Sequence, residues 1–393
     1  MCPIQSLRLR PRCFPAAVVA CTLLLRIILA ATEHTEATAY ATDDTDLTPT
    51  WPVATMWSVP AVRLAVVLVA IIFANTACWR RSTLPHALSD AEFSHLIDTL
   101  SEPPGVFALS DNVVSNEPHY ADTIQWMRAT GGAYIGVGPE QNFSYMAALQ
   151  PRIAFILDIR RENLDLQLLY KALFELSADR VDFVSRLFSR PRPAGLASSA
   201  SVDEIFESYA AATPSAELYA ATTARIRKQL LTTHALKLSE TDLQWIDVAL
   251  GAFYTSGPAI DYYGSNKVDA VRPSYRDLMT AKDFTRRPRS FLAREDAFTF
   301  IKDLQTRNLI VPIVGDFAGP SALRRIGDYV RDHHDRVGAM YGSNVGVYLT
   351  NQQRLNFCRS LATLPATKLT WFIDSNGRRL FDAKLRTCPK ESE

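Results

Sequence analysis

The 393-residue sequence has few cysteines, almost no net charge and neither of two common hydrolase motifs. Its six cysteines form no C-x-x-C pair and no regular framework, so neither a structural zinc site nor a disulfide-stapled miniprotein is supported. With 42 basic against 41 acidic side chains, the chain lacks the positive field that grips a phosphate backbone. We therefore expect no nucleic-acid partner. Gly-x-Ser-x-Gly and His-Glu-x-x-His are both missing, so the sequence gives no support for a hydrolase.

The first 82 residues differ from the rest because they contain two apolar runs and little that could build a domain. Residues 1–55 hold the first run and a Thr/Ala/Asp-rich stretch without an apolar face, which indicates a disordered leader or an upstream start choice. Residues 56–78 begin at Met56 and carry Arg63, an apolar run at 64–74 and small residues before Cys78. This order resembles a lipoprotein-type signal whose cysteine is lipidated, and it makes Met56 a candidate initiator beside Met1.

Three interpretations of residues 56–78 stay open: lipidation at Cys78, simple cleavage, or an uncleaved transmembrane anchor. The run is short for spanning a bilayer, which takes about 20 apolar residues. Each interpretation places the globular part outside the cytoplasm. We therefore expect an exported, periplasmic or membrane-anchored protein that meets the membrane through its N-terminal anchor. A misread leader would instead leave the protein in the cytoplasm.

Residues 79–393 alternate short apolar segments with helical patterns. Strands are expected at 133–137, 152–157, 309–314, 337–341 and 369–373, and they predict a mainly parallel α/β sheet in a three-layer, Rossmann-like αβα arrangement. Helical spacing predominates between about 160 and 290, which predicts a large helical insertion rather than a separate domain. Within it, a long helical region is expected from Leu164 to Leu187.

The most informative stretch is a strand, a glycine-containing turn, a helix and a second strand that ends in an acid. Gly136 and Gly138 follow the first strand, where the missing Cβ lets the backbone approach a ligand. Asp158 ends the second strand 158 − 136 = 22 residues later, a spacing typical of an acid that binds ribose hydroxyls. A dinucleotide fingerprint needs a third glycine where Gln141 stands, so the pattern favours S-adenosylmethionine over NAD or FAD.

Segments 136–163, 169–193, 309–330 and 341–349 resemble an uncharacterised family of bacterial, often exported, proteins whose core is similar to the class I S-adenosylmethionine-dependent methyltransferase fold. The resemblance covers roughly residues 91–374. It implies that Gly136 and Gly138 lie at the methionine end of the cofactor, Asp158 at its ribose and Asp316 beside its adenine. It also implies that Ser343 and Asn344 face the transferred methyl group.

Each of these residues also has a structural interpretation. The two glycines can simply make a tight turn, Asp158 can pair with Arg160 or Arg161, and Asp316 can cap the next helix. Gly346 stands where the family tends to carry an acid, so no residue is assigned to abstract a proton.

Two functions therefore stay open: an envelope-associated, methyltransferase-like protein that binds an adenosyl ligand, and a non-catalytic exported protein that binds another small molecule or a protein.

Overall fold

The computed structural model describes residues 82–107, 113–262 and 272–388, and residues 82–393 cluster as one compact unit. The two apolar runs of the leader, Met56 and Cys78 lie outside the described residues. Among the described helices, none is both long and apolar enough to cross a membrane.

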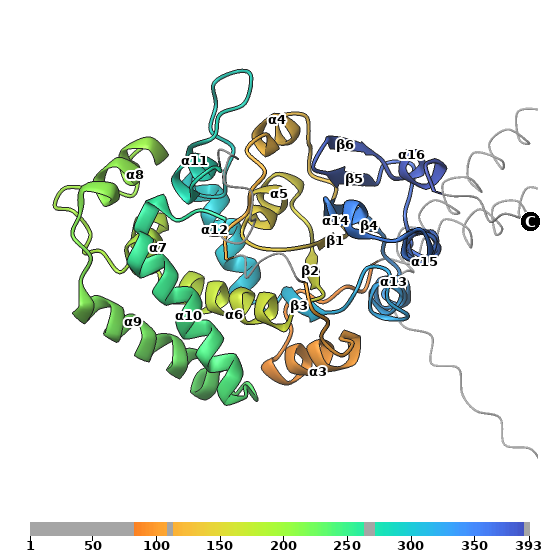
Figure 1. Cartoon of the computed structure of the whole chain (residues 1–393), viewed down its shortest axis with the longest axis horizontal. Coiled ribbons are helices and arrows are strands. Elements are labelled where there is room, and N and C mark those ends of the chain that lie inside the picture. Colours follow the sequence, from red (N-terminus) through yellow and green to blue (C-terminus); the bar gives the residue numbers. More distant parts are fainter. Residues whose placement is uncertain (1–81, 108–112, 263–271, 389–393) are drawn as a thin grey trace, which may run out of the picture. The chain divides into compact units, whose positions relative to one another are not determined.

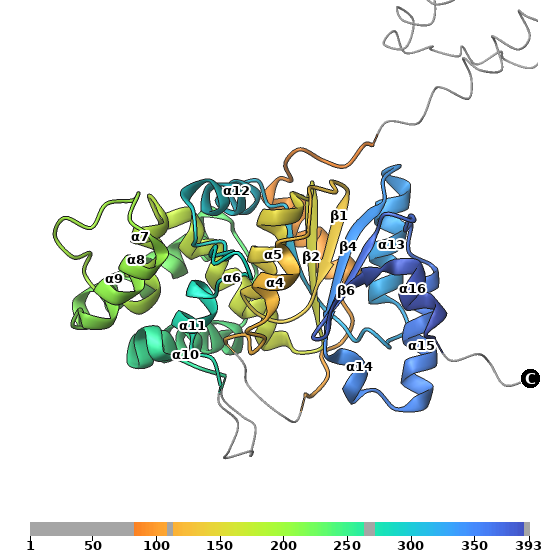
Figure 2. The ribbon, with the colours of Figure 1, turned by 90° about the horizontal axis from the view of Figure 1, so that it is seen from above.

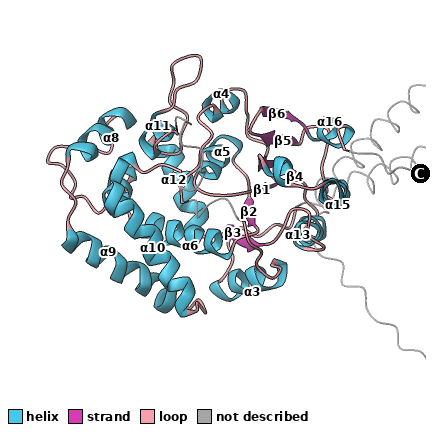
Figure 3. Ribbon diagram, viewed as in Figure 1, coloured by secondary structure: helices cyan, strands magenta, loops and turns pink. Residues whose placement is uncertain are grey.

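A six-stranded sheet forms the centre of this unit, in the order β3-β2-β1-β4-β5-β6 (Figures 1 and 3). Neighbouring strands pair in parallel except β5 and β6, which form an antiparallel pair. The strands are β1 (Ala133–Gly136), β2 (Ile153–Asp158), β3 (Ile310–Val314), β4 (Val337–Ser343), β5 (Trp371–Asp374) and β6 (Gly377–Leu380). The protein is thus a mixed α/β protein with a mostly parallel sheet, as the strand prediction requires.

The three strands that the sequence marks most clearly are buried along their whole length. Every residue of β1, β2 and β3 is buried, which explains their continuous apolar runs, since a strand covered on both faces has no polar side. All five predicted strands are present, with ends that shift by one or two residues. The added β6 is a four-residue strand that contains two arginines and was not predicted from its sequence.

Helices flank the sheet on both sides in Figure 2. On one side lie α5 (Gln141–Leu149), α6 (Arg161–Leu176) and α12 (Glu295–Thr306), and on the other lie α13 (Ala322–Asp332) and α15 (Asn351–Ala362). Shorter or peripheral helices are α3 (Asp90–Leu100), α4 (Tyr120–Ile124), α14 (Val345–Tyr348) and α16 (Phe381–Arg386). A capping box starts α3: Ser89 Oγ accepts a hydrogen bond from the Glu92 amide, and the Glu92 carboxylate accepts one from the Ser89 amide.

The described chain between β2 and α12 is mostly helical, and Figure 1 shows α7 to α10 away from the β5–β6 edge. After α6 come α7 (Arg180–Phe188), α8 (Val202–Ala211), α9 (Ala216–Lys228), η1 (Gln229–Thr233), α10 (Glu240–Ser256), η2 (Gly257–Ala259) and α11 (Tyr275–Thr280). The helical region expected from Leu164 to Leu187 is present, but as two helices, α6 and α7. It breaks after α6 because Asp179 takes an extended backbone and its side chain accepts from the Asp182 amide, which starts α7 as a new helix.

A disulfide joins Cys358 on α15 to Cys388 just beyond α16. The bond ties the last described helix to one that flanks the sheet. The two cysteines are 30 residues apart in sequence, so no short motif marks their pairing.

Candidate functional site

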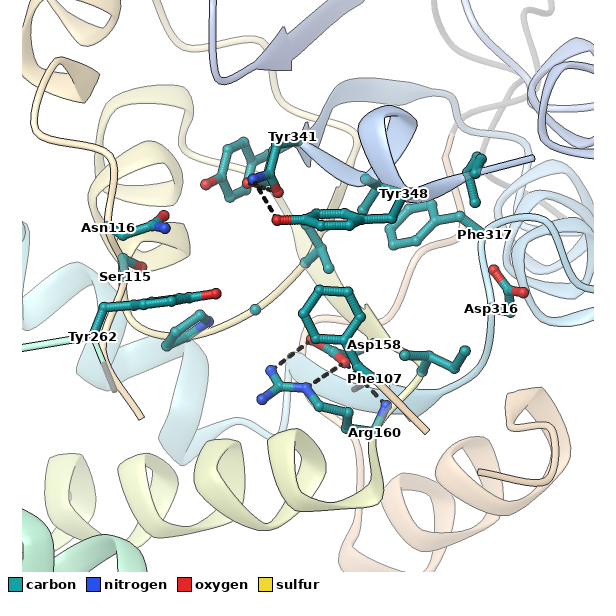
Figure 4. A pocket seen from close by; sticks show the side chains of 18 of the residues that line it. Phe107, Ser115, Asn116, Asp158, Arg160, Tyr262, Asp316, Phe317, Tyr341 and Tyr348 are labelled. Atoms are coloured by element: carbon teal, nitrogen blue, oxygen red, sulfur yellow. Dashed lines mark hydrogen bonds and ion pairs between the residues drawn. The ribbon is translucent and has the colours of Figure 1, made fainter. Parts of the chain in front are cut away.

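A cavity of about 250 Å³ opens at the carboxyl ends of the central strands (Figure 4). Five residues singled out from the sequence line it: Gly138, Asp158, Asp316, Ser343 and Asn344. They lie at or just after the carboxyl ends of four strands, β1, β2, β3 and β4, and they come together because these ends of parallel strands meet at one edge of a sheet. The lining is completed by Val106, Phe107, Val114, Ser115, Asn116, Val137, Pro139, Ile159, Arg160, Tyr262, Phe317, Tyr341, Val345, Tyr348, Leu349 and Gln353.

The two glycines of the turn after β1 have different roles. Gly138 has φ +76°, a conformation that side chains rarely adopt, and a Cβ built there would meet nothing within 4 Å. Gly136 is not among the residues that line the cavity. A Cβ on Gly136 would lie 1.9 Å from Asn142 Oδ1, so this glycine permits close packing of α5 on β1.

Asn142 holds the turn from inside α5. Its side-chain amide donates to the carbonyls of Val137 (2.9 Å), Gly138 (3.3 Å) and Pro139 (2.8 Å), while its Oδ1 accepts from the Tyr134 hydroxyl at 2.9 Å. The residue is completely buried. The loop that borders the cavity is therefore fixed by a side chain that does not line it.

Asp158 lies at the cavity wall but is engaged by a neighbour. Its Oδ1 accepts hydrogen bonds from the Arg160 amide (3.0 Å) and from Arg160 Nε (3.1 Å). Its Oδ2 accepts a third hydrogen bond, at 3.1 Å, from a terminal nitrogen of the Arg160 guanidinium. Figure 4 shows this pair on the cavity wall. Arg161, the other partner considered from the sequence, instead forms a bidentate ion pair with Asp242 of α10.

Asp316 lies on the side of the cavity opposite Tyr262 in Figure 4. Its Oδ1 accepts from the Ala318 amide at 2.9 Å, so it stabilises a local turn. The interpretation of Asp316 as the cap of the next helix is wrong. Ser321 is the N-cap residue of α13, and the Glu102 carboxylate accepts from the Ser321 and Ala322 amides there.

Ser343 and Asn344 come together at the end of β4 with a carboxylate that the sequence analysis missed. Ser343 has φ +43°, a strained value for a serine and one that clusters at functional sites. Its hydroxyl donates to Glu117 Oε1, and Gln141 Nε2 donates to Glu117 Oε2 at 3.3 Å. Burial raises the pKa of Glu117, and the nearby Asp374 adds to this rise. Glu117 lies in an irregular segment with no periodic pattern, so no sequence signal marks it.

Glu140 is the second carboxylate that was not singled out, although it belongs to the turn after β1. It is fully buried, and both of its carboxylate oxygens lie 3.2 Å from the Ser115 amide nitrogen, whose N–H they accept. Burial raises the pKa of Glu140 to about 7. The contact joins the turn after β1 to the segment that contributes Ser115 and Asn116 to the cavity wall.

Aromatic side chains narrow the cavity. Phe107 and Tyr348 meet edge to face with ring centroids 4.9 Å apart, and Phe317 and Tyr262 also line the space. Tyr254 stacks on Tyr219 and does not line the cavity. Within the described residues, no group of three or more His, Cys, Asp or Glu could hold a metal ion.

Comparison with known proteins places residues 112–387 in a family described as a domain of unknown function, DUF7790. The chain belongs to this family. The matched region includes the cavity-lining residues from Val114 to Gln353 and leaves Val106 and Phe107 outside it. No curated protein matches the chain. Membership in the DUF7790 family assigns no activity, so the functional argument depends on the geometry of the cavity.

Proposed function

We propose that the chain is an exported, methyltransferase-like protein whose cavity binds an adenosine-containing metabolite, with S-adenosylmethionine as the first ligand to test. One observation carries the proposal: five of the six residues chosen from the sequence for this ligand, at the carboxyl ends of four different strands, line one cavity.

The sheet order supports a Rossmann-like interpretation of the fold. From the centre of the sheet, β1, β2 and β3 follow one another toward one edge, and β4 and β5 follow one another toward the other edge. The order therefore reverses between β1 and β4, and open parallel sheets bind ligands at such a switch point, outside the carboxyl ends of the strands. The cavity includes residues that follow both of these strands.

The chemistry of the wall suits a nucleoside. The open space beside Gly138 allows close backbone approach, and the Asp158 carboxylate is of the type that binds ribose hydroxyls. The rings of Phe317 and Tyr348 offer flat apolar surfaces for a purine. Ser343, the strained last residue of β4, adds a hydroxyl group to this wall.

The Cys358–Cys388 disulfide supports the exported location, because such bonds persist in oxidising compartments and are rare in the cytosol. We expect mass spectrometry of the mature amino terminus to find a diacylglyceryl adduct on Cys78. An intact Met1 would contradict export by the proposed leader.

A second candidate function is a non-catalytic exported protein that keeps the fold and binds a partner through the helices between about 160 and 290. Two observations favour it. Arg160 already occupies both oxygens of Asp158, and the cavity of about 250 Å³ is below the 300–1,000 Å³ usual for small-molecule sites. An exported protein would also lack a supply of S-adenosylmethionine, which is made in the cytoplasm.

Calorimetric titration of the full-length protein with S-adenosylmethionine and S-adenosylhomocysteine separates the two candidates. The first expects saturable binding that Asp158→Asn weakens about 10- to 100-fold, because hydrogen bonds to a charged group contribute about 1.5–3 kcal/mol. Arg160→Gln should strengthen binding, since it releases the carboxylate from its competitor. Asp303→Asn, at a half-exposed position on α12, is the matched control and should change nothing.

The test is specific because the two variants are expected to change the ligand affinity in opposite directions. Both variants break the same ion pair, so a purely structural effect would weaken binding in both. Equal losses, or no heat with the unaltered protein at millimolar ligand, would exclude the adenosyl ligand and favour the second candidate.

A further inference from the structure

A second and larger cavity, of about 770 Å³, lies next to the first one. The two cavities share Asn116 and Asn344 as lining residues. The second is lined by Asn116, Glu117, Pro118, His119, Tyr120, Asp122, Thr123, Trp126, Tyr145, Phe284, Asn344, Asp374, Ser375, Asn376, Gly377 and Arg378. It is thus built mainly from the segment that leads into α4 and from the turn between β5 and β6.

Negative charge predominates on this lining. Three carboxylates, those of Glu117, Asp122 and Asp374, line the cavity together with one guanidinium, that of Arg378. Asp374 Oδ2 is already paired with Arg379 at 2.8 Å, so the excess negative charge lies at Glu117 and Asp122. The Arg378 guanidinium lies 4.8 Å from the centre of the Trp371 ring, which already provides it with a cation–π contact. The cavity therefore suits a cation better than an anion.

Aromatic rings form the rest of the wall. Tyr120 and Tyr145 are buried, with 2% and 1% of their surface exposed, whereas Trp126 and Phe284 are 59% and 79% exposed. Two large aromatic side chains on the rim of one cavity are costly to leave in water. Flat rings beside carboxylates are the groups with which proteins bind organic ammonium ions, through the negative face of the ring.

A buried oxygen inside this wall lacks a partner. Asp122 Oδ1 is shielded from solvent and accepts no hydrogen bond from the described residues. Such an atom costs about 1–3 kcal/mol when left unsatisfied, and a rotation of the Asp122 side chain toward a cationic donor in the cavity would satisfy it. Glu117 lies in the same wall and is held there by Ser343 and Gln141.

We propose that the second cavity binds an organic ammonium ion, with Asp122 and Glu117 facing its charge and Trp126 and Phe284 covering its alkyl groups. A metal ion fits the wall less well, because the described residues hold no group of three or more ligating side chains. The proposal does not depend on the adenosyl ligand of the first cavity.

The test uses choline as the probe and 3,3-dimethylbutan-1-ol, which has the same shape without the charge, as its neutral counterpart. Both are titrated against the full-length protein, and binding is followed by ligand-observed NMR. We expect choline to bind at least about 10-fold more tightly than the alcohol. Trp126→Leu should weaken choline binding about 2- to 30-fold, the range that loss of one cation–π contact produces.

Asp122→Asn keeps the size of the side chain and removes its charge, so it should weaken choline binding while leaving the alcohol unaffected. Asp328→Asn, at an exposed position on α13, is the matched control and should leave both affinities unchanged. The proposal is overturned if the two probes bind equally. It is also overturned if choline shows no saturable binding up to about 10 mM, or if Asp122→Asn leaves choline binding unchanged.

Discussion

Replacement of Glu140 by glutamine should make the protein more stable at alkaline pH than the unaltered chain. Glu140 is fully buried, and burial raises its pKa from an ordinary value of 4.5 to about 7. The folded protein therefore holds the proton more tightly than the unfolded chain. Stability from this group is fully present below pH 4.5 and is lost as the pH rises through about 7.

The size of this loss follows from the shift. A rise of about 2.5 pKa units, from 4.5 to about 7, corresponds to about 3 kcal/mol. Most of it develops between about pH 5 and about pH 8. Glutamine keeps an oxygen that can accept from the Ser115 amide but cannot ionise, so Glu140→Gln should remove about 2 to 3 kcal/mol of pH dependence.

The assay is denaturant unfolding of the unaltered protein and of the variant at about pH 5 and about pH 8. The free energy of unfolding of the variant minus that of the unaltered protein should increase as the pH rises. Glu207→Gln on α8, where the side chain is 66% exposed, is the matched control and should follow the unaltered protein. If Glu140→Gln keeps the pH dependence of the unaltered protein, Glu140 does not titrate as a buried acid and the reasoning is wrong.

Two further predictions concern stability. Burial lowers the pKa of His234, but its hydrogen bonds to Glu175 and Asp90 outweigh burial and raise the pKa overall. The stability from this raised pKa is present below about pH 6.5 and is lost as the pH rises further, so His234→Gln should cost roughly 1–3 kcal/mol at about pH 5.5 and less at about pH 9 in denaturant unfolding. Gly136→Ala should lower stability by about 1–3 kcal/mol, measured by thermal unfolding, because the new methyl group would overlap Asn142.

Each of these has a clear contrary outcome. An equal cost of His234→Gln at both pH values would mean that the ring contributes by packing rather than by charge. For the glycine, Gly346→Ala is the control, since a Cβ there meets nothing within 4 Å. Equal effects of the two alanine variants would contradict the close contact between β1 and α5.

The sequence alone predicted five of the six strands of the sheet and the strand ends at which a site could form. Continuous apolar runs predict β1, β2 and β3 because strands buried on both faces need no polar side. Capping residues mark the start of a helix in the sequence because their hydrogen bonds are local, as between Ser89 and Glu92 at the start of α3. Gly138 and Asp158 were found because each comes directly after a recognisable strand.

Only the tertiary structure decided which partners those residues have. The choice of Arg160 rather than Arg161 for Asp158 depends on α10, because Asp242 holds Arg161 from across 81 residues of chain. Glu117 meets Ser343 across 226 residues, and neither belongs to a pattern that predicts the other. Periodicity and capping are local properties of the chain, whereas the polarity of a cavity is set by segments that meet only when the sheet is complete.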